Sequence, residues 1–390
     1  MSEIKVNSIK GVGASTAAIT LNNTDGTCTA NVTNNLSNKN IIINGGMIVS
    51  QRNGTTATAV TGSSQYTLDR IKGSNNSDAA FTIAQSSTAP DGFANSLKVD
   101  VTTADTSLDA GHYGQLMYLV EARDLQQLGF GTSGAKACIL SFYVRSNKTG
   151  NYGVAVLQDD NSSKQVSFQY TINSANTWER KSFVIPADTS GVINNDNGRG
   201  FDIHIGFAAG TTYTSGSLRS SFTTFADADL YAGQGVNLFD STSNEWYITG
   251  IQLEVDNTGS GKPTDFEHRS FAQELALCQR YYYVLVNQNG KYFNPGYTYV
   301  NGLVYCNLKH PVQMRTTGSL EQTTGSSYYR FYYNGGVHDF TGFYKTDWST
   351  KDFATLQIRP TEFGGSTLSD KVGAVYTYNS DSYVAFSAEL

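Results

Sequence analysis

The stretch that decides the organisation of this chain is Glu245–Tyr283, EWYITGIQLEVDNTGSGKPTDFEHRSFAQELALCQRYYY, because its hydrophobic period changes twice. Apolar and polar residues alternate over 247–255, which predicts a strand. A turn rich in Gly, Ser and Pro follows, and apolar residues then recur every three or four positions between Ser270 and Arg280. This spacing predicts a short helix, with Ser270 as its N-cap and Gln273 in its first turn.

The composition on either side of this stretch is that of a β protein. Charged residues make up 15% of the 390, and there are 38 Gly, 24 Tyr and 20 Phe. Residues of these kinds favour strands and turns over helices. We therefore predict an all-β protein: a jelly-roll-like β-sandwich, a short helical connector, and a second, smaller antiparallel β domain.

Changes of pattern divide the chain into an N-terminal segment 1–39, a sandwich 40–265, a connector 266–283 and a tyrosine-rich tip domain 284–390. Strand-like segments separated by turn signals fill the sandwich region, as expected of a sandwich or jelly roll. These expected strands are 41–43, 47–49, 66–71, 80–85, 96–101, 114–120, 139–145, 152–158, 165–172, 178–185, 201–208 and 246–255. A helical turn is expected over 124–128. Trp178 could stack on a sugar or anchor the core, and we favour the core.

Charge, cysteines and hydropathy exclude several classes of protein. The formal net charge is −6 and no Lys/Arg cluster stands out, which argues against a nucleic-acid partner. Cys28, Cys138, Cys278 and Cys306 are far apart and predict reduced, mostly buried thiols. The sequence has no run of 18 apolar residues and no signal-peptide pattern at its start, so we expect neither membrane insertion nor a secretory route.

A catalytic or metal centre is not predicted. The five His are scattered, and adjacent carboxylates such as Asp159-Asp160 are better explained as a solvated turn than as the acid/base pair of a glycosidase. We expect no enzyme activity, no catalytic residue, no metal site and no cofactor. A structural calcium held by Asp69, Glu254 and neighbouring turns is the one alternative kept open.

The tip domain holds the best candidates for binding. Fifteen of the 24 Tyr lie between Tyr281 and Tyr383. Sugars present flat C–H faces and many hydroxyls, so a site for them needs aromatic platforms beside Asn, Asp, Gln and Arg. Since half the side chains of a strand point inward, we expect at least half of the aromatic residues on the tip-domain strands to belong to the core. The predicted glycan- or receptor-binding residues are Tyr328, Tyr329, Arg330, Tyr332, Tyr333, Asn334, His338, Asp339, Tyr344 and Trp348.

Several segments resemble parts of tail-fibre and receptor-binding proteins of tailed bacteriophages. GIQLEV at 250–255 with FEHRSFAQELALCQRYYY at 266–283 resembles their domain-boundary motif, and LKHPVQMRTTGSL at 308–320 resembles a motif of their tip domains, although Thr317-Gly318 replaces the usual Pro. SLKVDV at 96–101, ILSFYVRSNKTGNYGVAV at 139–156, NTWERKSFVIP at 176–186 and YITGIQLE at 247–254 resemble a carbohydrate-binding module with a jelly-roll fold.

The resemblance implies a non-enzymatic structural virion protein, a tail fibre or adhesin that recognises host cell-surface glycans. It also implies a homotrimer, made in the host cytoplasm and located in the virion tail. Residues 1–39 are either a flexible leader or, as we favour, a virion-attachment segment that binds other tail or adaptor proteins through Ile4, Val6 and Ile9. The alternative is a head-decorating or tail-scaffold protein that acts only through protein–protein packing. The polar residues of the connector, among them Glu267, Arg269 and Arg280, are expected to form ion pairs and caps between domains.

Overall fold

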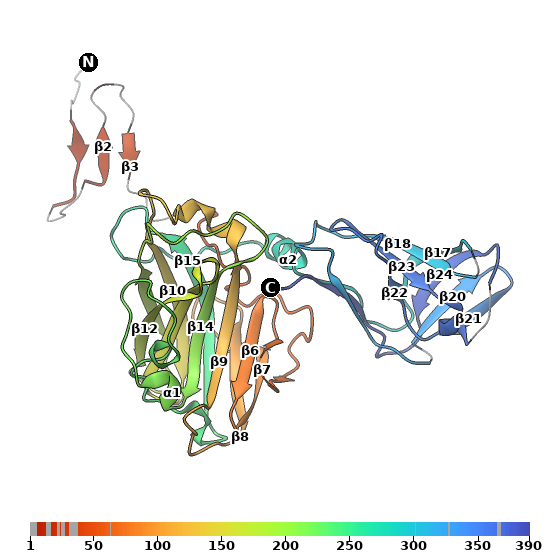
Figure 1. Ribbon diagram of the computed structural model, residues 1–390, viewed down its shortest axis with the longest axis horizontal. Coiled ribbons are helices and arrows are strands. Elements are labelled where there is room, and N and C mark those ends of the chain that lie inside the picture. The colour runs from red at the N-terminus through yellow and green to blue at the C-terminus, as the bar shows by residue number, and fades with distance from the viewer. Residues whose placement is uncertain are drawn as a thin grey trace.

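The computed structural model describes residues 6–12, 17–21, 24, 28–30, 38–62, 64–300, 302–326, 328–364 and 368–390. Within them the chain is all-β, and a short helix joins two β-rich bodies (Figure 1). No helix of this part of the chain has the length and apolar character needed to cross a membrane.

Two six-stranded antiparallel sheets form a β-sandwich, which confirms the predicted fold class. The first sandwich sheet contains, in order, β13 (Glu179–Ile185), β10 (Cys138–Ser146), β15 (Glu245–Val255), β8 (Ser96–Thr103), β7 (Ala80–Ser86) and β4 (Thr58–Ala59). The second sandwich sheet contains β12 (Lys164–Ile172), β11 (Gly150–Gln158), β14 (Arg199–Ala209), β9 (Tyr113–Glu121), β6 (Ile71–Asn76) and β5 (Gln65–Tyr66). Short helices in the connections are η1 (Ala122–Leu128), η2 (Asp159–Asn161), α1 (Thr211–Thr214), η3 (Asp227–Asp229) and η4 (Leu238–Asp240).

Alternating side chains of the two sheets fill one core between them. Leu140, Phe142 and Val144 of β10 are fully buried there, and the rings of Phe207 and Trp246 meet edge to face with centroids 5.0 Å apart. Burial of such side chains contributes about 2 kcal/mol each, so this core is the main source of sandwich stability.

Trp178 does not anchor the core, contrary to our expectation. Its side chain is half-buried just before β13, and its ring lies edge-on to Tyr247 with centroids 6.3 Å apart. Trp246 on β15 takes the core position instead.

The expected strands over Ile41–Ile43 and Met47–Val49 are wrong, because both segments are buried but irregular. In the first segment the Ile42 N–H donates to Asn40 Oδ1 at 3.0 Å, and the Ile43 N–H donates to the Tyr118 hydroxyl at 2.8 Å. In the second segment the partner is Asn44. Its side-chain amide donates to the carbonyls of Val49 at 2.8 Å and Asp69 at 3.0 Å, and its Oδ1 accepts from the Val49 N–H at 2.9 Å. A side chain that completes buried backbone hydrogen bonds removes the need for a sheet.

The connector contains the helix α2 (Phe271–Gln279), as the sequence predicts. Ser270 and Gln273 form a capping box: the Ser270 hydroxyl accepts from the Gln273 N–H at 3.3 Å, and the Gln273 side chain accepts from the Ser270 N–H at 3.0 Å. Such a box satisfies two of the orphan donors of the first turn. The helix therefore begins where the capping residues predict.

The distal body is built from two antiparallel sheets with their own core. The small distal sheet contains β16 (Tyr282–Val286), β25 (Val384–Ser387) and β19 (Ser319–Gln322). The large distal sheet contains, in order, β21 (Gly336–Phe340), β20 (Tyr329–Tyr333), β24 (Val372–Thr377), β17 (Tyr292–Thr298), β18 (Val304–Lys309), β23 (Phe353–Ile358) and β22 (Tyr344–Lys345), with η5 (Pro360–Phe363) after β23.

A buried ionic contact joins the two bodies, and Figure 1 shows the C-terminal residues lying back at this junction. Arg70, 1% exposed, pairs through Nη1 with Glu389 at 2.5 Å and donates through Nη2 to the Leu119 carbonyl at 2.5 Å. Its guanidinium also lies 3.6 Å from the ring centroid of Tyr281. Arg52 forms a second ion pair with Glu389 at 3.3 Å.

The polar residues of the connector form ion pairs and caps, as expected. Arg280 pairs with Glu121 of β9 at 2.6 Å, and Arg269 pairs with Glu274 of α2 at 3.3 Å. The Glu267 carboxylate accepts from the backbone N–H groups of residues 38, 39 and 40. These contacts fix the sandwich, the connector and the chain entering from the N-terminal segment against one another.

The N-terminal segment contains a three-stranded antiparallel sheet of β1 (Ser8–Ile9), β2 (Ile19–Leu21) and β3 (Cys28–Ala30). Of the predicted attachment residues, Val6 and Ile9 are 41% and 53% exposed, whereas Ile4 lies outside the described residues. Apolar side chains on such a small sheet have little of this chain to pack against.

Candidate functional site

Strand register places a row of large side chains on the outer face of the large distal sheet. Val372 of β24 lies opposite Tyr297 of β17, which lies opposite Tyr305 of β18. Tyr305 in turn lies opposite Gln357 of β23, and Gln357 opposite Tyr344 of β22. Because side chains alternate between the two faces of a strand, all five point away from the distal core.

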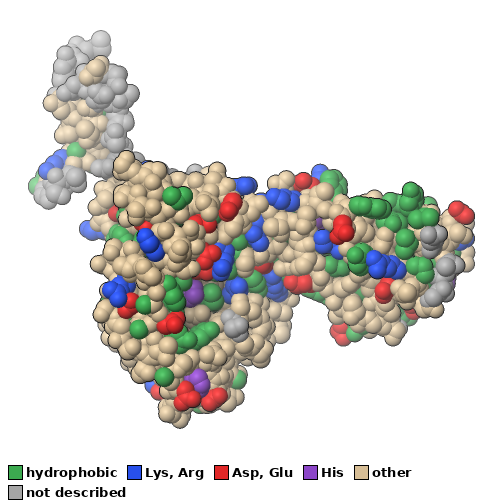
Figure 2. Space-filling view, in the orientation of Figure 1, with side chains coloured by type: hydrophobic (Ala, Val, Ile, Leu, Met, Phe, Trp, Pro, Cys, Tyr) green, Lys and Arg blue, Asp and Glu red, His purple; other side chains and the backbone are tan. Residues whose placement is uncertain are grey.

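Three aromatic rings gather around Tyr305 on this face, and with Tyr305 they make a cluster of four. Tyr297 and Trp348 stack on it, with ring centroids 6.1 Å and 5.8 Å away and interplanar angles of 25° and 14°. Tyr299 meets it edge-on at 5.8 Å. We call these four residues the aromatic platform, and Figure 2 shows hydrophobic side chains concentrated on the distal body over β17 and β18.

The members of the aromatic platform differ sharply in exposure. Tyr305 is 4% exposed because its neighbours cover it, whereas Tyr297, Tyr299 and Trp348 are 40%, 73% and 66% exposed. Tyr305 therefore positions the other three rings, and these offer the surface that a ligand can contact. Exposed apolar patches of this kind are common on interaction surfaces.

Two amide side chains lie among the rings. Gln357 donates from Nε2 to the Tyr305 hydroxyl at 2.6 Å, and Asn307 donates from Nδ2 to the Tyr297 hydroxyl at 3.4 Å. These bonds orient both tyrosines and leave amide and hydroxyl groups beside apolar ring faces. Such a surface suits a ligand with C–H faces and hydroxyls.

An arginine lies at the edge of this row. Arg359 follows β23, its guanidinium lies 3.5 Å from the ring centroid of Tyr344, and its Nε donates to Gln357 Oε1 at 3.3 Å. Gln357 thus connects Arg359 to Tyr305, so the cation belongs to the same site as the aromatic platform.

The structure divides the predicted glycan-binding residues into three groups. Tyr332, Asn334, Asp339, Tyr344 and Trp348 are exposed. Tyr328, Arg330, Tyr333 and His338 are half-buried. Tyr329 is fully buried, with its ring against Phe340 and Phe343 and its hydroxyl donating to the carbonyls of Thr323 and Tyr383. Tyr329 is a core residue and cannot contact a ligand in the folded protein.

The predicted residues that do lie on the outer face occupy two parts of it. Tyr344 and Trp348 lie at the site of the aromatic platform. Arg330 and Asp339 pair with each other on β20 and β21. Tyr297, Tyr299 and Tyr305 are not among the predicted residues, although the alternation in YTYV and VYCN places these tyrosines on one face of their strands.

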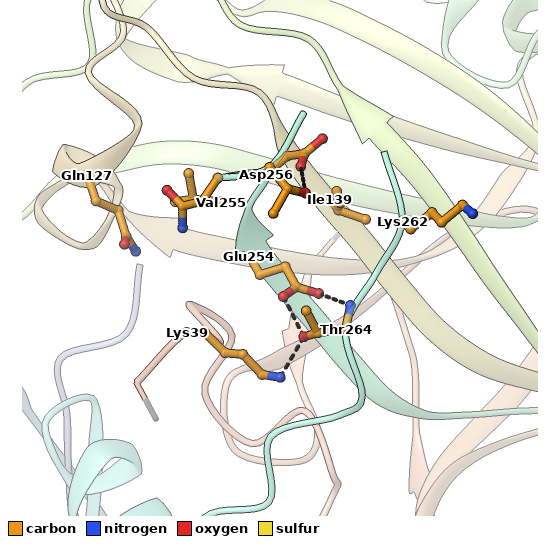
Figure 3. A pocket seen from close by; sticks show the side chains of 10 residues that line it. Lys39, Gln127, Ile139, Glu254, Val255, Asp256, Lys262 and Thr264 are labelled. Carbon is orange, nitrogen blue, oxygen red and sulfur yellow. Dashed lines mark hydrogen bonds between the residues drawn. The ribbon is translucent and has the colours of Figure 1, made fainter. Parts of the chain in front are cut away.

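The carboxylates proposed for a structural calcium are occupied by donors of the protein. Glu254 accepts from the Thr264 N–H at 2.8 Å and the Thr264 hydroxyl at 2.6 Å, beside a 70 Å³ pocket where Lys39 Nζ also donates to Thr264 (Figure 3). Asp69 accepts from the backbone N–H and the side-chain amide of Gln51 at 2.6 and 2.5 Å. Each oxygen of these two carboxylates therefore already accepts a hydrogen bond from the protein.

Another group of metal-ligand residue types lies at the opposite end of the sandwich. In the ranges that the structure describes, one ligand atom each from Asp78, Asp105 and His112 lie within 4.8 Å of one another. His112 Nδ1 lies 3.0 Å from Asp105 Oδ2. This contact engages two of the three side chains with each other.

Two buried titratable groups lie side by side on β14, facing away from the sandwich core. Burial raises the pKa of Asp202 to about 6, partly offset by Arg199 at 3.0 Å. Burial, together with the positive charges of Arg199 and Lys72, lowers the pKa of His204 to about 4. His204 is therefore neutral near pH 7, and its Nδ1 lies 3.2 Å from Gln115 Oε1.

Two grooves open at the junction of the two bodies. One, of 530 Å³, runs along α2 and includes Leu277, Arg280 and Val312. The other, of 780 Å³, lies between residues 50–56 of the sandwich and the distal loop 380–383. Arg269 and Arg280 of the first groove form the ion pairs of the connector, and Glu267 accepts from backbone N–H groups.

No protein-family model and no curated protein matches the chain. Among solved structures, it is similar to the enzymatically active domain of tailspike protein 4 of bacteriophage CBA120, with 11% identity, 55% of this chain, 21% of that chain and a TM-score of 0.29. It is also similar to a family 22 carbohydrate-binding module of Clostridium thermocellum, with 11% identity, 57% of this chain, 99% of the module and a TM-score of 0.30. An exo-β-agarase matches with 11% identity over 80% of this chain and 49% of its own, at a TM-score of 0.28. Likeness at these scores carries no argument about the function of this chain.

Proposed function

We propose that the chain is a non-enzymatic adhesin that binds cell-surface glycans through the outer face of the large distal sheet. The observation that carries this proposal is the aromatic platform, in which Tyr305 holds three exposed rings beside two amide side chains. Carbon–hydrogen faces of a sugar ring pack on such rings, and its hydroxyls exchange hydrogen bonds with the amides.

Affinity is expected to depend on the exposed rings rather than on Tyr305. Loss of one aromatic contact removes about 1.5 kcal/mol, which is about tenfold in affinity. Trp348 and Tyr299 have the largest exposed fractions of the aromatic platform, at 66% and 73%. They are the side chains whose removal changes binding most while leaving the distal core intact.

The test is a glycan array and a host-cell adsorption assay on full-length protein. Trp348→Ala and Tyr299→Ala should each weaken binding about tenfold, whereas Phe271→Ala, which removes a ring 58% exposed on α2, should not. Equal binding by all three variants, or no glycan binding by the wild type, would overturn the proposal. Full-length protein is required because removal of 284–390 would leave Arg70 buried without Glu389.

We extend the proposal to a homotrimeric tail fibre of a tailed bacteriophage, with residues 1–39 as the virion-attachment segment. Its support is the resemblance of residues 250–283 to the boundary motif of such proteins, and the exposure of Val6 and Ile9. Light scattering should give three times 42.3 kDa, and Val6→Asp with Ile9→Asp should abolish incorporation into particles. A monomer, or particles that lack the protein yet adsorb normally, would refute this extension.

A purely structural role in the head or tail gives a different pattern of results. It predicts that substitutions in the aromatic platform impair particle assembly and leave the adsorption of assembled particles unchanged.

A further inference from the structure

Two arginines lie on the outer face of the large distal sheet, and their surroundings differ in one respect. Arg330 lies 3.1 Å from the ring centroid of Tyr378 and forms an ion pair with Asp339. Arg359 lies 3.5 Å from the ring centroid of Tyr344, and no carboxylate of the described residues lies within ion-pair distance of it. The positive charge of Arg359 is therefore left uncompensated beside the aromatic platform.

The guanidinium of Arg359 is held in one orientation by two contacts. The Tyr344 ring supports its face, and its Nε donates to Gln357 Oε1 at 3.3 Å. Its backbone lies directly between two regular elements, because Arg359 follows the last residue of β23 and occupies the N-cap position of η5. With Nε engaged, the two terminal nitrogens remain as a fork of donors, whose geometry matches both oxygens of a carboxylate.

A hydrogen-bonded chain links this fork to the aromatic platform. Gln357 accepts from Arg359 and donates to the Tyr305 hydroxyl at 2.6 Å, and Tyr305 stacks with Trp348. A sugar packed on the exposed rings would thus present its neighbouring residue to Arg359. Residues 284–390 contain eight Lys or Arg and eight Asp or Glu, so the distal body does not repel an anionic ligand, although the whole chain carries −6.

We propose that the site recognises acidic glycans, with a uronate-type carboxylate bound by Arg359 while the sugar rings pack on the aromatic platform. This inference rests on the proposed glycan-binding function and names the class of ligand. An arginine that is stacked, oriented and lacks an acidic partner distinguishes a carboxylated sugar from its neutral counterpart.

The test compares a polyuronate, alginate, with the same polymer after reduction of its carboxyl groups to neutral hydroxymethyl groups. Full-length wild-type protein should bind alginate about tenfold more tightly than it binds the reduced polymer, since a hydrogen bond between charged groups contributes at least a tenfold gain in affinity. Arg359→Gln should abolish the preference and Arg359→Lys should retain part of it. Arg330→Gln should leave it unchanged, because Arg330 already has Asp339.

The outcomes separate this inference from the function on which it rests. Equal wild-type affinity for both polymers, or an undiminished preference in Arg359→Gln, would refute the acidic-ligand assignment. Binding of either polymer that falls in Trp348→Ala would still support glycan binding at the aromatic platform. Binding of neither polymer by the wild type would refute the assignment for polyuronates, and failure across the whole glycan array would refute both proposals. Reduction of the polymer alters only the ligand, so this comparison holds even if an Arg359 variant folds poorly.

Discussion

The buried ion pair between Arg70 and Glu389 allows a quantitative test of how the two bodies are joined. Replacing Arg70 by Met keeps the length of the side chain but removes its charge and its bond to the Leu119 carbonyl. The carboxylate of Glu389 then stays buried, at 4% side-chain exposure, with Arg52 at 3.3 Å as its remaining ion-pair partner. Breaking one side of a buried pair costs about 3–5 kcal/mol.

Because Arg52 still pairs with Glu389, we expect Arg70→Met to lower the free energy of unfolding by about 3 kcal/mol, the lower end of this range. The backbone of Arg70 has φ = 70°, and this strain is common to the wild type and the variant, so it cancels. The double variant Arg70→Met/Glu389→Gln should recover part of the loss, because it removes the orphaned charge. Such recovery would identify the interaction as electrostatic rather than as lost packing.

Urea denaturation followed by near-ultraviolet circular dichroism measures the free energy of unfolding of each variant. Arg330→Met is the matched control, because Arg330 also stacks on a tyrosine and pairs with an aspartate but lies at the surface. Surface pairs contribute at most about 1 kcal/mol. If Arg70→Met costs no more than Arg330→Met, the junction is not held by this buried pair.

Three further predictions follow from burial and close contact. Asp202→Asn should stabilise the protein by on the order of 3 kcal/mol at pH 7, since the folded pKa of Asp202, about 6, exceeds the ordinary 3.8. In thermal melts this gain in stability should disappear as the pH falls from 6 to 4. A gain that does not depend on pH would contradict the prediction. Gly45→Ala should lower the free energy of unfolding by about 3 kcal/mol, because a Cβ would lie 2.0 Å from the Ile251 carbonyl oxygen. The control Gly235→Ala has open space around the added Cβ and should change stability by less than about 0.5 kcal/mol. Equal melting temperatures for the two variants would refute the clash. Burial raises the pKa of Cys138, so mass spectrometry should find it modified by iodoacetamide only after unfolding.

Strands with a clear polar–apolar alternation could be predicted from sequence. The stretch 139–145 became β10 and 246–255 became β15 because each has one face in a core. Ile41–Ile43 could not be assigned in this way, since a short apolar run looks alike in a strand and in a buried irregular segment. Its backbone N–H groups bond to Asn40 Oδ1 and to the hydroxyl of Tyr118, which lies 75 positions along the chain from Ile43.

The sequence predicted the kinds of residue at the candidate site better than it predicted which individual residues face the solvent. Tyr329 and Tyr332 lie on the same strand and alternate in direction, so one became core and the other surface. Which of them faces water depends on the sheet that covers the strand, and sequence alone does not show this. Tyr305 stacks with Trp348 through a loop contact between residues 43 positions apart. Contacts of this range are set by tertiary packing.

The environment of Trp348 reports directly on whether glycans bind at the aromatic platform. The chain has three tryptophans; Trp246 is fully buried, Trp348 is 66% exposed, and Trp178→Phe removes the half-buried third. Acrylamide quenching of this variant therefore reports on Trp348. Saturation with a bound glycan should protect the quenchable fluorescence, because the sugar covers the ring. Calorimetric glycan binding with unchanged quenching would place the site elsewhere and refute binding at the aromatic platform.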